Sequence, residues 1–198
     1  MSEAKVDSDR RTWIAIACGA GAVGGAAVAV PFVASFAPSE RAKAAGAPVQ
    51  ADISALRPGE KMTVEWRGKP VWIVRRTEEQ VAGLDKLDSQ LADPFSKRNP
   101  DELTPEYARN VPRSIKPEVL VCVGICSHLG CSPVDRFTPG AQPSLPDDWA
   151  GGFLCPCHGS TFDMAGRVFK NKPAPDNLEV PRHMYLSDTL LLIGEDKA

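Results

Sequence analysis

Two short clusters of cysteine and histidine contain most of the residues in this chain that could do chemistry. Residues 126–131 read CSHLGC and residues 155–160 read CPCHGS. Together they hold four of the six cysteines and two of the three histidines. Two thiolates and two imidazoles could hold a two-iron, two-sulfur (2Fe-2S) cluster in which His replaces Cys on one iron. Each cluster then has one further cysteine.

Such a mixed ligand set would raise the reduction potential of the cluster. Two ferric ions, two sulfides and two thiolates sum to zero charge, whereas an all-cysteine cluster starts at minus two. Adding an electron to a neutral centre costs less, so potentials reach roughly −150 to +300 mV rather than about −400 mV. Reduction also makes the outer imidazole nitrogen more basic, so the site could take an electron and a proton together, as from a quinol.

One Cys and one His from each cluster would also suit tetrahedral structural zinc. Against zinc, each cluster carries a spare cysteine, which is rare in zinc sites of this kind and suits a disulfide between the two loops. A brown colour and an electron paramagnetic resonance (EPR) signal from an iron–sulfur cluster would exclude the zinc alternative.

The clusters resemble the two boxes of the Rieske iron–sulfur proteins, Cys-Thr-His-Leu-Gly-Cys and Cys-Pro-Cys-His-Gly-Ser, and depart from them only at Ser127. By position, the resemblance implies one 2Fe-2S cluster per chain. It implies four ligands: Cys126, His128, Cys155 and His158. It also implies a disulfide between Cys131 and Cys157.

Four further residues match family positions that tune the cluster. Leu129 would shield it, and Ser160 would donate its hydroxyl to a bridging sulfide. Pro173 lies in Lys172-Pro173-Ala174-Pro175, which is similar to the family's proline loop. Phe162 stands where many respiratory members have a Tyr that bonds a ligand sulfur. Because such a bond stabilises the reduced cluster, its absence predicts a lower potential.

The remaining pattern predicts a mainly β body that positions the clusters. The chain has 16 glycines and 18 prolines among 198 residues, which favours a loop-rich β fold. Residues 62–66 and 71–76 predict a hairpin, and residues 120–123 predict a buried strand that leads into the first cluster. The resemblance implies an antiparallel β-sandwich head with a small cluster-binding subdomain at about residues 121–181.

Other segments predict the following elements. Residues 160–169 predict two strands joined by a turn at Gly166, and residues 178–180 and 189–193 predict closing strands. Residues 77–91 have helical spacing, and Thr77 offers a capping box. Residues 94–117 read as a long connection and residues 132–153 as a long surface insertion.

Residues 12–39 carry no charge, and we predict a transmembrane helix over residues 12–37. A cleaved signal peptide would have a shorter apolar core of about 7–15 residues. Ala45-Gly46-Ala47 resembles a cleavage site, but Pro48 follows it directly and disfavours cleavage. The sequence therefore favours a retained anchor.

The segments predict four parts. Residues 1–11 form a cytoplasmic tail whose Arg10-Arg11 looks like a twin-arginine signal or, alternatively, a plain positive-inside flank. The transmembrane helix follows, then a hinge or linker at residues 38–50. Residues 51–198 form a periplasmic Rieske domain. The expected location is the bacterial inner membrane, with a single pass.

The chain most resembles the iron–sulfur subunits of bacterial ubiquinol–cytochrome c reductase, the cytochrome bc complex. The resemblance implies electron and proton uptake from ubiquinol, electron delivery to a cytochrome c-type haem subunit, and a contribution to proton translocation. It also implies cytochrome b as a partner, a dimeric complex, and quinol contact by His158 first and His128 second. The net charge of −2 gives no reason to expect nucleic acid.

Three related functions stay open. A soluble Rieske ferredoxin serving an oxygenase is disfavoured by the spare cysteines and the apolar run. The small subunit of an arsenite oxidase and a plastoquinol-oxidising relative fit less well. The two cysteine and histidine motifs are separated by a long stretch of sequence, and the anchor is retained. Of the other residues, Cys18 and Cys122 read as buried thiols, and His183 reads as structural or exposed.

Overall fold

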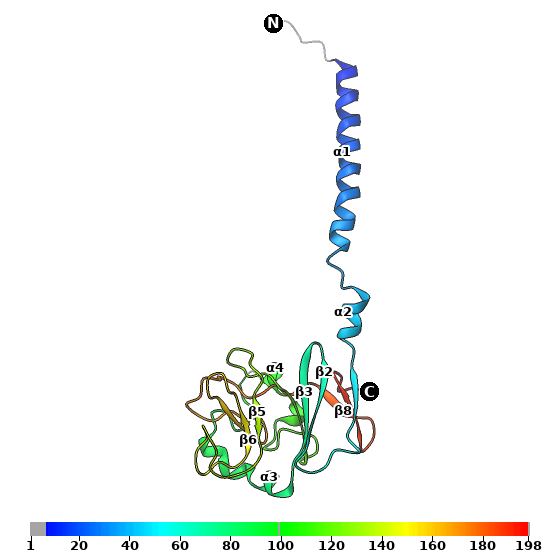
Figure 1. Cartoon of the computed structure of the whole chain (residues 1–198). Helices are drawn as coiled ribbons and strands as arrows, with labels where there is room; N and C mark the ends of the chain where they lie inside the picture. The colour runs from blue at the N-terminus through cyan, green and yellow to red at the C-terminus, as the bar shows by residue number, and fades with distance from the viewer. Residues whose placement is uncertain (1–6, 99, 198) are drawn as a thin grey trace. The chain divides into compact units, whose positions relative to one another are not determined.

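The computed structural model describes residues 7–98 and 100–197, and it divides into two units, 1–44 and 45–198, which are described separately. Figure 1 shows the helices of the first unit and the strands of the second. Residues 1–6 of the predicted tail lie outside the described residues.

The first unit contains α1 (Ser8–Ala34), and α2 (Glu40–Ala45) follows. The carboxylate of Asp7 caps α1 by accepting hydrogen bonds from the N–H groups of Asp9 and Arg10. The helix therefore starts at Ser8 rather than at the predicted Thr12, and it ends at Ala34 rather than at residue 37. It is long and apolar enough to cross a membrane, with a mean hydropathy of 1.9. No described α1 residue is buried, so Cys18 is exposed in this chain rather than buried as predicted.

The second unit is built from three antiparallel sheets of three strands each. One has the order β1-β9-β8, from β1 (Val49–Asp52), β9 (Leu190–Ile193) and β8 (His183–Tyr185). The middle sheet has the order β2-β3-β4, from β2 (Lys61–Trp66), β3 (Lys69–Arg75) and β4 (Val119–Val123). The third has the order β5-β6-β7, from β5 (Val134–Arg136), β6 (Gly152–Leu154) and β7 (Thr161–Asp163).

The middle sheet separates two hydrophobic cores. Successive side chains of a strand point to opposite faces, so β3 and β4 feed both cores and are buried along most of their length. One face packs against the third sheet and the cysteine loops; we call it the cluster core, and its strand residues include Trp72, Val74, Leu120 and Cys122. The other face packs against β1 and β9; we call it the base core, and it includes Val71, Ile73, Val119, Val121 and Val123.

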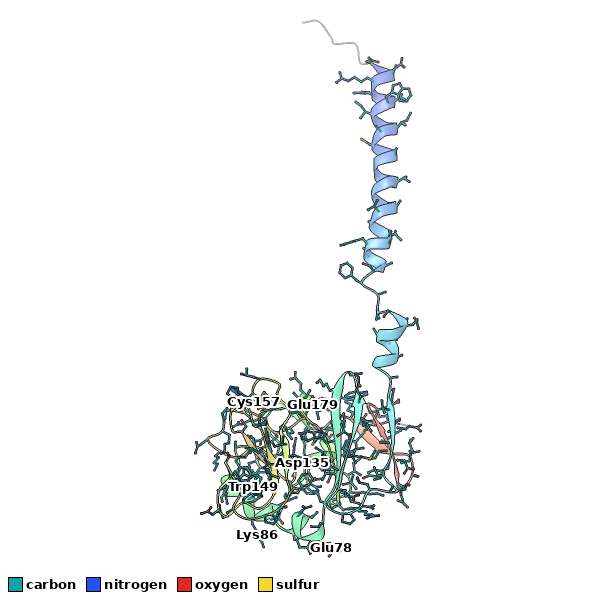
Figure 2. All side chains as sticks on the ribbon, in the orientation of Figure 1. Glu78, Lys86, Asp135, Trp149, Cys157 and Glu179 are labelled. Carbon is teal, nitrogen blue, oxygen red and sulfur yellow. A yellow bond between two sulfur atoms is a disulfide. The ribbon has the colours of Figure 1, made fainter. Side chains whose placement is uncertain are left out.

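The short helices are α3 (Glu78–Ala82), a 3-10 turn (Leu84–Gln90), α4 (Pro100–Leu103) and a second 3-10 turn (Glu106–Ala108). The capping box at Thr77 is confirmed, since its hydroxyl accepts from the Gln80 N–H and the Gln80 side chain accepts from the Thr77 N–H. The predicted helix over residues 77–91 is interrupted at Gly83, where glycine lowers helix stability. Figure 2 shows Glu78 of α3 at the end of this unit away from Cys157.

Three buried arginines organise the connection over residues 94–117, which has little secondary structure. Arg76, Arg113 and Arg167 are at most 2% exposed, and they join this connection to β7 and the turn after it. Within the connection, Arg76 donates to the Pro112 carbonyl and Arg167 to the Pro94 carbonyl. Arg76 donates to the Met164 carbonyl, Arg113 to the Ala165 carbonyl, and Arg167 pairs with Asp163. Burial lowers the pKa of Arg113 to about 10, so its guanidinium stays charged at neutral pH.

The mainly antiparallel β architecture is confirmed, including the hairpin of β2 and β3, the strand β4, the turn at Gly166 and the strand β9. Three predictions are wrong. The second of the two strands predicted over residues 160–169 does not form, because after the turn only isolated bridges join Val168 to Phe162 and Phe169 to Leu91. Residues 178–180 form no strand, because Glu179 and Val180 make single backbone bonds to Val123 and Leu103 instead of a ladder. The 132–153 insertion is not wholly at the surface, because Trp149 is 3% exposed and Phe153, on β6, is fully buried.

Candidate functional site

The two cysteine loops, residues 126–131 (the first loop) and 155–160 (the second loop), share one backbone fold. In each, the N–H of the first cysteine donates to the carbonyl five residues later, and a glycine N–H donates back to that cysteine's carbonyl. The four bonds are Cys126 N to Cys131 O (2.8 Å), Gly130 N to Cys126 O (3.1 Å), Cys155 N to Ser160 O (2.7 Å) and Gly159 N to Cys155 O (3.0 Å). Gly130 (φ 79°) and Gly159 (φ 74°) both adopt left-handed backbone, which glycine reaches at little cost.

A disulfide joins the two loops. Cys131 and Cys157 are bonded, as predicted, across a sequence separation of 26 residues. The bond ties the loops together at their outer side, where Cys157 is exposed at one end of the unit (Figure 2).

The four predicted ligands form two pairs. Cys126 and Cys155 are free thiols, each 2% exposed, and their side chains are close enough to hydrogen-bond. The rings of His128 and His158 meet edge to face, with centroids 4.8 Å apart. His158 is exposed and His128 is half-buried. The two sulfur donors thus lie together inside, and the two imidazoles lie together toward solvent.

The two cysteine side chains of the site are buried, but hydrogen-bond donors reach the Cys126 sulfur. Burial raises the pKa of the Cys126 thiol, while hydrogen bonds from the His128 N–H and the Ser160 hydroxyl act in the opposite direction. Because metals bind the thiolate, metal binding here would release the thiol proton. The same hydrogen bonds would then stabilise negative charge on sulfur.

The donor arrangement fits a two-metal centre better than a single zinc ion. Tetrahedral zinc places its donors about 3.3–3.8 Å from one another. In the described part of the chain, the only group of three or more possible donors within 4.8 Å of one another is Cys131, Cys155 and Cys157, and two of these are used by the disulfide. A sulfur pair and a separate nitrogen pair suit two iron ions with different ligands.

One serine from each loop holds residues 172–176, which comprise the predicted proline loop (172–175) and Asp176; we call this whole segment the proline loop. The Ser127 hydroxyl donates to the Asp176 carbonyl (2.7 Å) and accepts from the Asp176 N–H (3.2 Å). The Ser160 hydroxyl accepts from the Ala174 N–H (2.9 Å). The proline loop is therefore fastened to both cysteine loops by hydrogen bonds.

Two residues that hold the proline loop, Ser127 and Arg98, were not predicted to do so from the sequence. The sequence drew attention to Ser127 only as a departure from the family box, although serine hydroxyls commonly bond nearby backbone. Arg98 donates to the Pro175 carbonyl (2.7 Å) from a distant part of the chain, and no sequence signal pointed to it.

The other predicted tuning residues lie around the loops. Leu129 is 70% exposed beside the imidazoles, and Pro173 is also exposed, so the loops end in a partly apolar tip. Phe162 is fully buried in the cluster core opposite Phe153.

The remaining cysteine and histidine candidates are not brought to the site as donors. Cys122 is buried, as predicted, and burial raises the pKa of its thiol to about 12, which leaves it protonated and unreactive. His183 is 1% exposed, its Nδ1 lies 2.8 Å from the Pro181 carbonyl, and burial lowers the pKa of its imidazole. His183 is therefore a structural residue in the folded chain.

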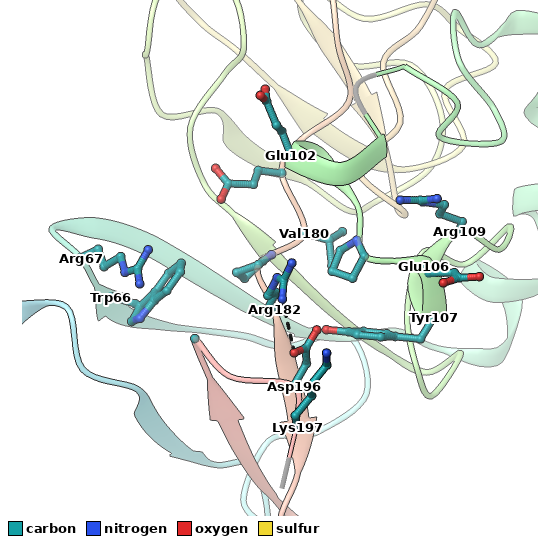
Figure 3. A pocket seen from close by; sticks show the side chains of 14 residues that line it. Trp66, Arg67, Glu102, Glu106, Tyr107, Arg109, Val180, Arg182, Asp196 and Lys197 are labelled. Atoms are coloured by element: carbon teal, nitrogen blue, oxygen red, sulfur yellow. Dashed lines mark ion pairs between the residues drawn. The ribbon is translucent and has the colours of Figure 1, made fainter.

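A polar cleft of about 730 Å³ lies among Trp66, Tyr107, Arg182 and Asp196 (Figure 3). Large clefts are the usual first candidates for binding sites. This one is lined by none of the four candidate ligands, and its charges are balanced, with Arg182 and Asp196 3.7 Å apart. We therefore place the chemistry at the loops rather than in the cleft.

Comparisons with known proteins show which family the chain is similar to. Residues 97–182 match the model of the Rieske [2Fe-2S] domain, and residues 1–39 match that of the Ubiquitinol-cytochrome C reductase Fe-S subunit TAT signal. The chain is 57% identical to the ubiquinol-cytochrome c reductase iron-sulfur subunit of Allochromatium vinosum, over 95% of this chain and 89% of that protein. It is 40% identical to the subunit of that name from Bradyrhizobium diazoefficiens, over 93% of this chain and 94% of that protein.

Among solved structures, the chain aligns with a chain of a hyperthermophilic respiratory Complex III. The alignment has a TM-score of 0.46 and 27% sequence identity, and it covers 90% of this chain and 98% of the other.

Proposed function

This chain belongs to the family of Rieske iron–sulfur subunits of ubiquinol-cytochrome c reductase, and from that premise we propose how its residues carry electrons from ubiquinol toward a c-type haem. Its function is electron transfer within that complex, and its cofactor is a Rieske 2Fe-2S cluster. The observation that carries this conclusion is the 57% identity over nearly the whole chain.

The proposed ligands are the two pairs at the loops. Cys126 and Cys155 would hold the inner iron, because both are free, buried thiols. His128 and His158 would hold the outer iron, because their rings meet at the solvent side. When bound, the cluster supplies one-electron transfer at a raised potential.

The chain's own groups would provide the rest of the chemistry. His158 is exposed, so the ring nitrogen that does not bind iron can accept a hydrogen bond from a quinol hydroxyl and take its proton. His128 is less exposed and is our second choice for that contact. The apolar side chain of Leu129 and the exposed prolines beside it would exclude water from the quinol contact.

The membrane anchoring and partners follow from the same family. The twin-arginine signal match and the apolar α1 helix fit a membrane-anchored bacterial subunit. Membership of the complex implies cytochrome partners. We further propose that the N-terminus is cytoplasmic, that the head is periplasmic, and that the head meets ubiquinol on cytochrome b within a dimeric complex. The Arg10 and Arg11 pair in the first turn of α1 supports this orientation.

Purification of the full chain from its native membranes tests the proposal. We expect it to co-purify with two b haems and one c-type haem and to show a Rieske EPR signal that ubiquinol reduces. His158→Ala should abolish that reduction, whereas Lys86→Ala, an exposed cation on the part of the head away from Cys157 (Figure 2), should leave it unchanged. Co-purification with an arsenite-oxidising subunit and no b haem would overturn the proposal.

A further inference from the structure

Trp72 lies between the two strands that lead into the cysteine loops. It is on β3, across from Cys122 on β4, and it is 3% exposed in the cluster core. Cys122 faces the same core as Trp72, and Cys126, which follows the end of β4, belongs to that core as well.

The first contact of Trp72 is with Gly124, two residues before Cys126. A Cβ added to Gly124 would lie 2.1 Å from Cε2 of the indole and 2.5 Å from Cζ2. The backbone of Gly124 is not left-handed, so the space taken by the indole is what requires glycine here.

The second contact is with Phe153, two residues before Cys155. The rings of Trp72 and Phe153 stack with centroids 5.1 Å apart and planes 19° apart. The Nζ of Lys61 lies 4.3 Å from the centroid of the indole and 2.6 Å from a carboxylate oxygen of Asp135. Asp135 is the register partner of Phe153, so the lysine joins the indole to the neighbouring strand as well.

We propose that Trp72 is a positioning residue for the cluster, which sets the separation of the two cysteine loops by contacting both strands that lead into them. Two residues of extended chain span about 6.6 Å. A shift of Gly124 would therefore move Cys126, and a shift of Phe153 would move Cys155. The inference rests on the proposed ligand set, and it adds a residue that lies outside both loops.

The base core supplies a matched control in Trp66. It is 7% exposed, a cation lies over its ring, since Arg67 is 4.5 Å from the centroid, and it also packs on a glycine. A Cβ on Gly194 would lie 2.5 Å from the Trp66 Nε1. Trp66 thus has the same kind of surroundings as Trp72 but belongs to the base core, which contains neither Cys126 nor Cys155.

The experiment compares Trp72→Leu and Trp72→Phe with Trp66→Leu and Trp66→Phe in the full chain in membranes. Three quantities are measured: the thermal unfolding midpoint, the width of the Rieske EPR lines, and the half-life of that signal on warming. Both leucine variants should lower the unfolding midpoint. Only Trp72→Leu should broaden the lines and shorten the half-life, by about fivefold or more, with Trp72→Phe in between.

Trp72→Phe keeps the test decisive if Trp72→Leu fails to assemble, and a second pair of variants tests the contact between Trp72 and Gly124. Gly124→Ala should lose most of the signal, and Gly124→Ala with Trp72→Leu should regain part of it, because the smaller side chain makes room for the new methyl group. Unchanged lines and half-life in Trp72→Leu, equal changes in Trp66→Leu, or no recovery in the double variant would overturn the inference alone. A wild-type chain without a Rieske signal would overturn the proposed function as well.

Discussion

The two cysteine loops have the same backbone hydrogen bonds but are used differently. The first loop presents its histidine two residues after the ligand cysteine and keeps it half-buried, whereas the second presents its histidine three residues after and exposes it. The serines differ too: Ser127 bonds only the proline loop in the described contacts, while Ser160 is fully buried and acts on both the proline loop and Cys126.

The features that hold the cluster are therefore different from the features that set its potential. In the proposed ligand set, the matched backbone and the shared disulfide would make the loops equal partners in holding two metals. The side chains around that backbone are unequal, so the potential and the quinol contact should depend more on the second loop. Four predictions follow from this division, beginning with the largest effect.

Removing either histidine should abolish the cluster. His128→Ala and His158→Ala each remove one of two nitrogen donors, and we expect complete loss of the Rieske EPR signal in both. His183→Gln is the control and should retain the signal, because His183 is buried elsewhere and bonds a backbone carbonyl. A signal that survives in only one of the two alanine variants would show that the loops do not hold the metals equally.

Replacing either cysteine of the disulfide should lower the unfolding free energy of the head by the same amount. The closed loop of 26 residues corresponds to about 3.5 kcal/mol of unfolding free energy. Cys131→Ser and Cys157→Ser should therefore lower the denaturant midpoint equally, with Cys122→Ser as the free-thiol control. A clear difference between the first two variants would mean that one loop depends on the bond more than the other.

The two serines should differ in their effect on the midpoint potential. Ser160→Ala removes a donor to sulfur, which destabilises the reduced, more negative cluster, so the potential should fall by about 60 mV for a loss of about 1.4 kcal/mol. Ser127→Ala removes only bonds to Asp176, so its potential should stay within about 20 mV of wild type. Equal shifts in redox titrations of the two variants would contradict the assigned asymmetry.

The smallest expected effect is a rise of the midpoint potential when a hydroxyl is added close to the second loop. Phe162 is fully buried in the same core as Cys155, and Phe162→Tyr adds a hydroxyl that can bond a ligand sulfur. A net gain of about 1 kcal/mol for the reduced form would raise the midpoint potential by about 40 mV. Phe162→Leu is the control, since it changes the packing without adding a donor, and a tyrosine variant with an unchanged potential would refute the prediction.

Local patterns made the cysteine loops and several strands predictable. The loops are encoded within six residues each, and the hairpin of β2 and β3 follows from alternation on both sides of a short turn, which the structure places at Arg67-Gly68. The capping box at Thr77 is equally local. Each of these depends on neighbours in the sequence, which a single chain displays directly.

Long-range contacts were not predictable in the same way. Arg113 lies in a connection without periodicity, yet it is fully buried because it satisfies carbonyls far along the chain. Trp72 and Gly124 depend on each other across β3 and β4, and Arg98 reaches Pro175 from another segment. Nothing in the local sequence marks these pairs, because each partner is ordinary on its own.

Pulsed EPR of the ascorbate-reduced full chain in membranes tests the central claim most directly, since it detects nitrogen bound to iron. We expect couplings from two histidine nitrogens in the wild-type chain and no iron–sulfur signal in either histidine variant. A reduced iron–sulfur signal without nitrogen coupling, or a colourless chain holding one zinc ion, would contradict it.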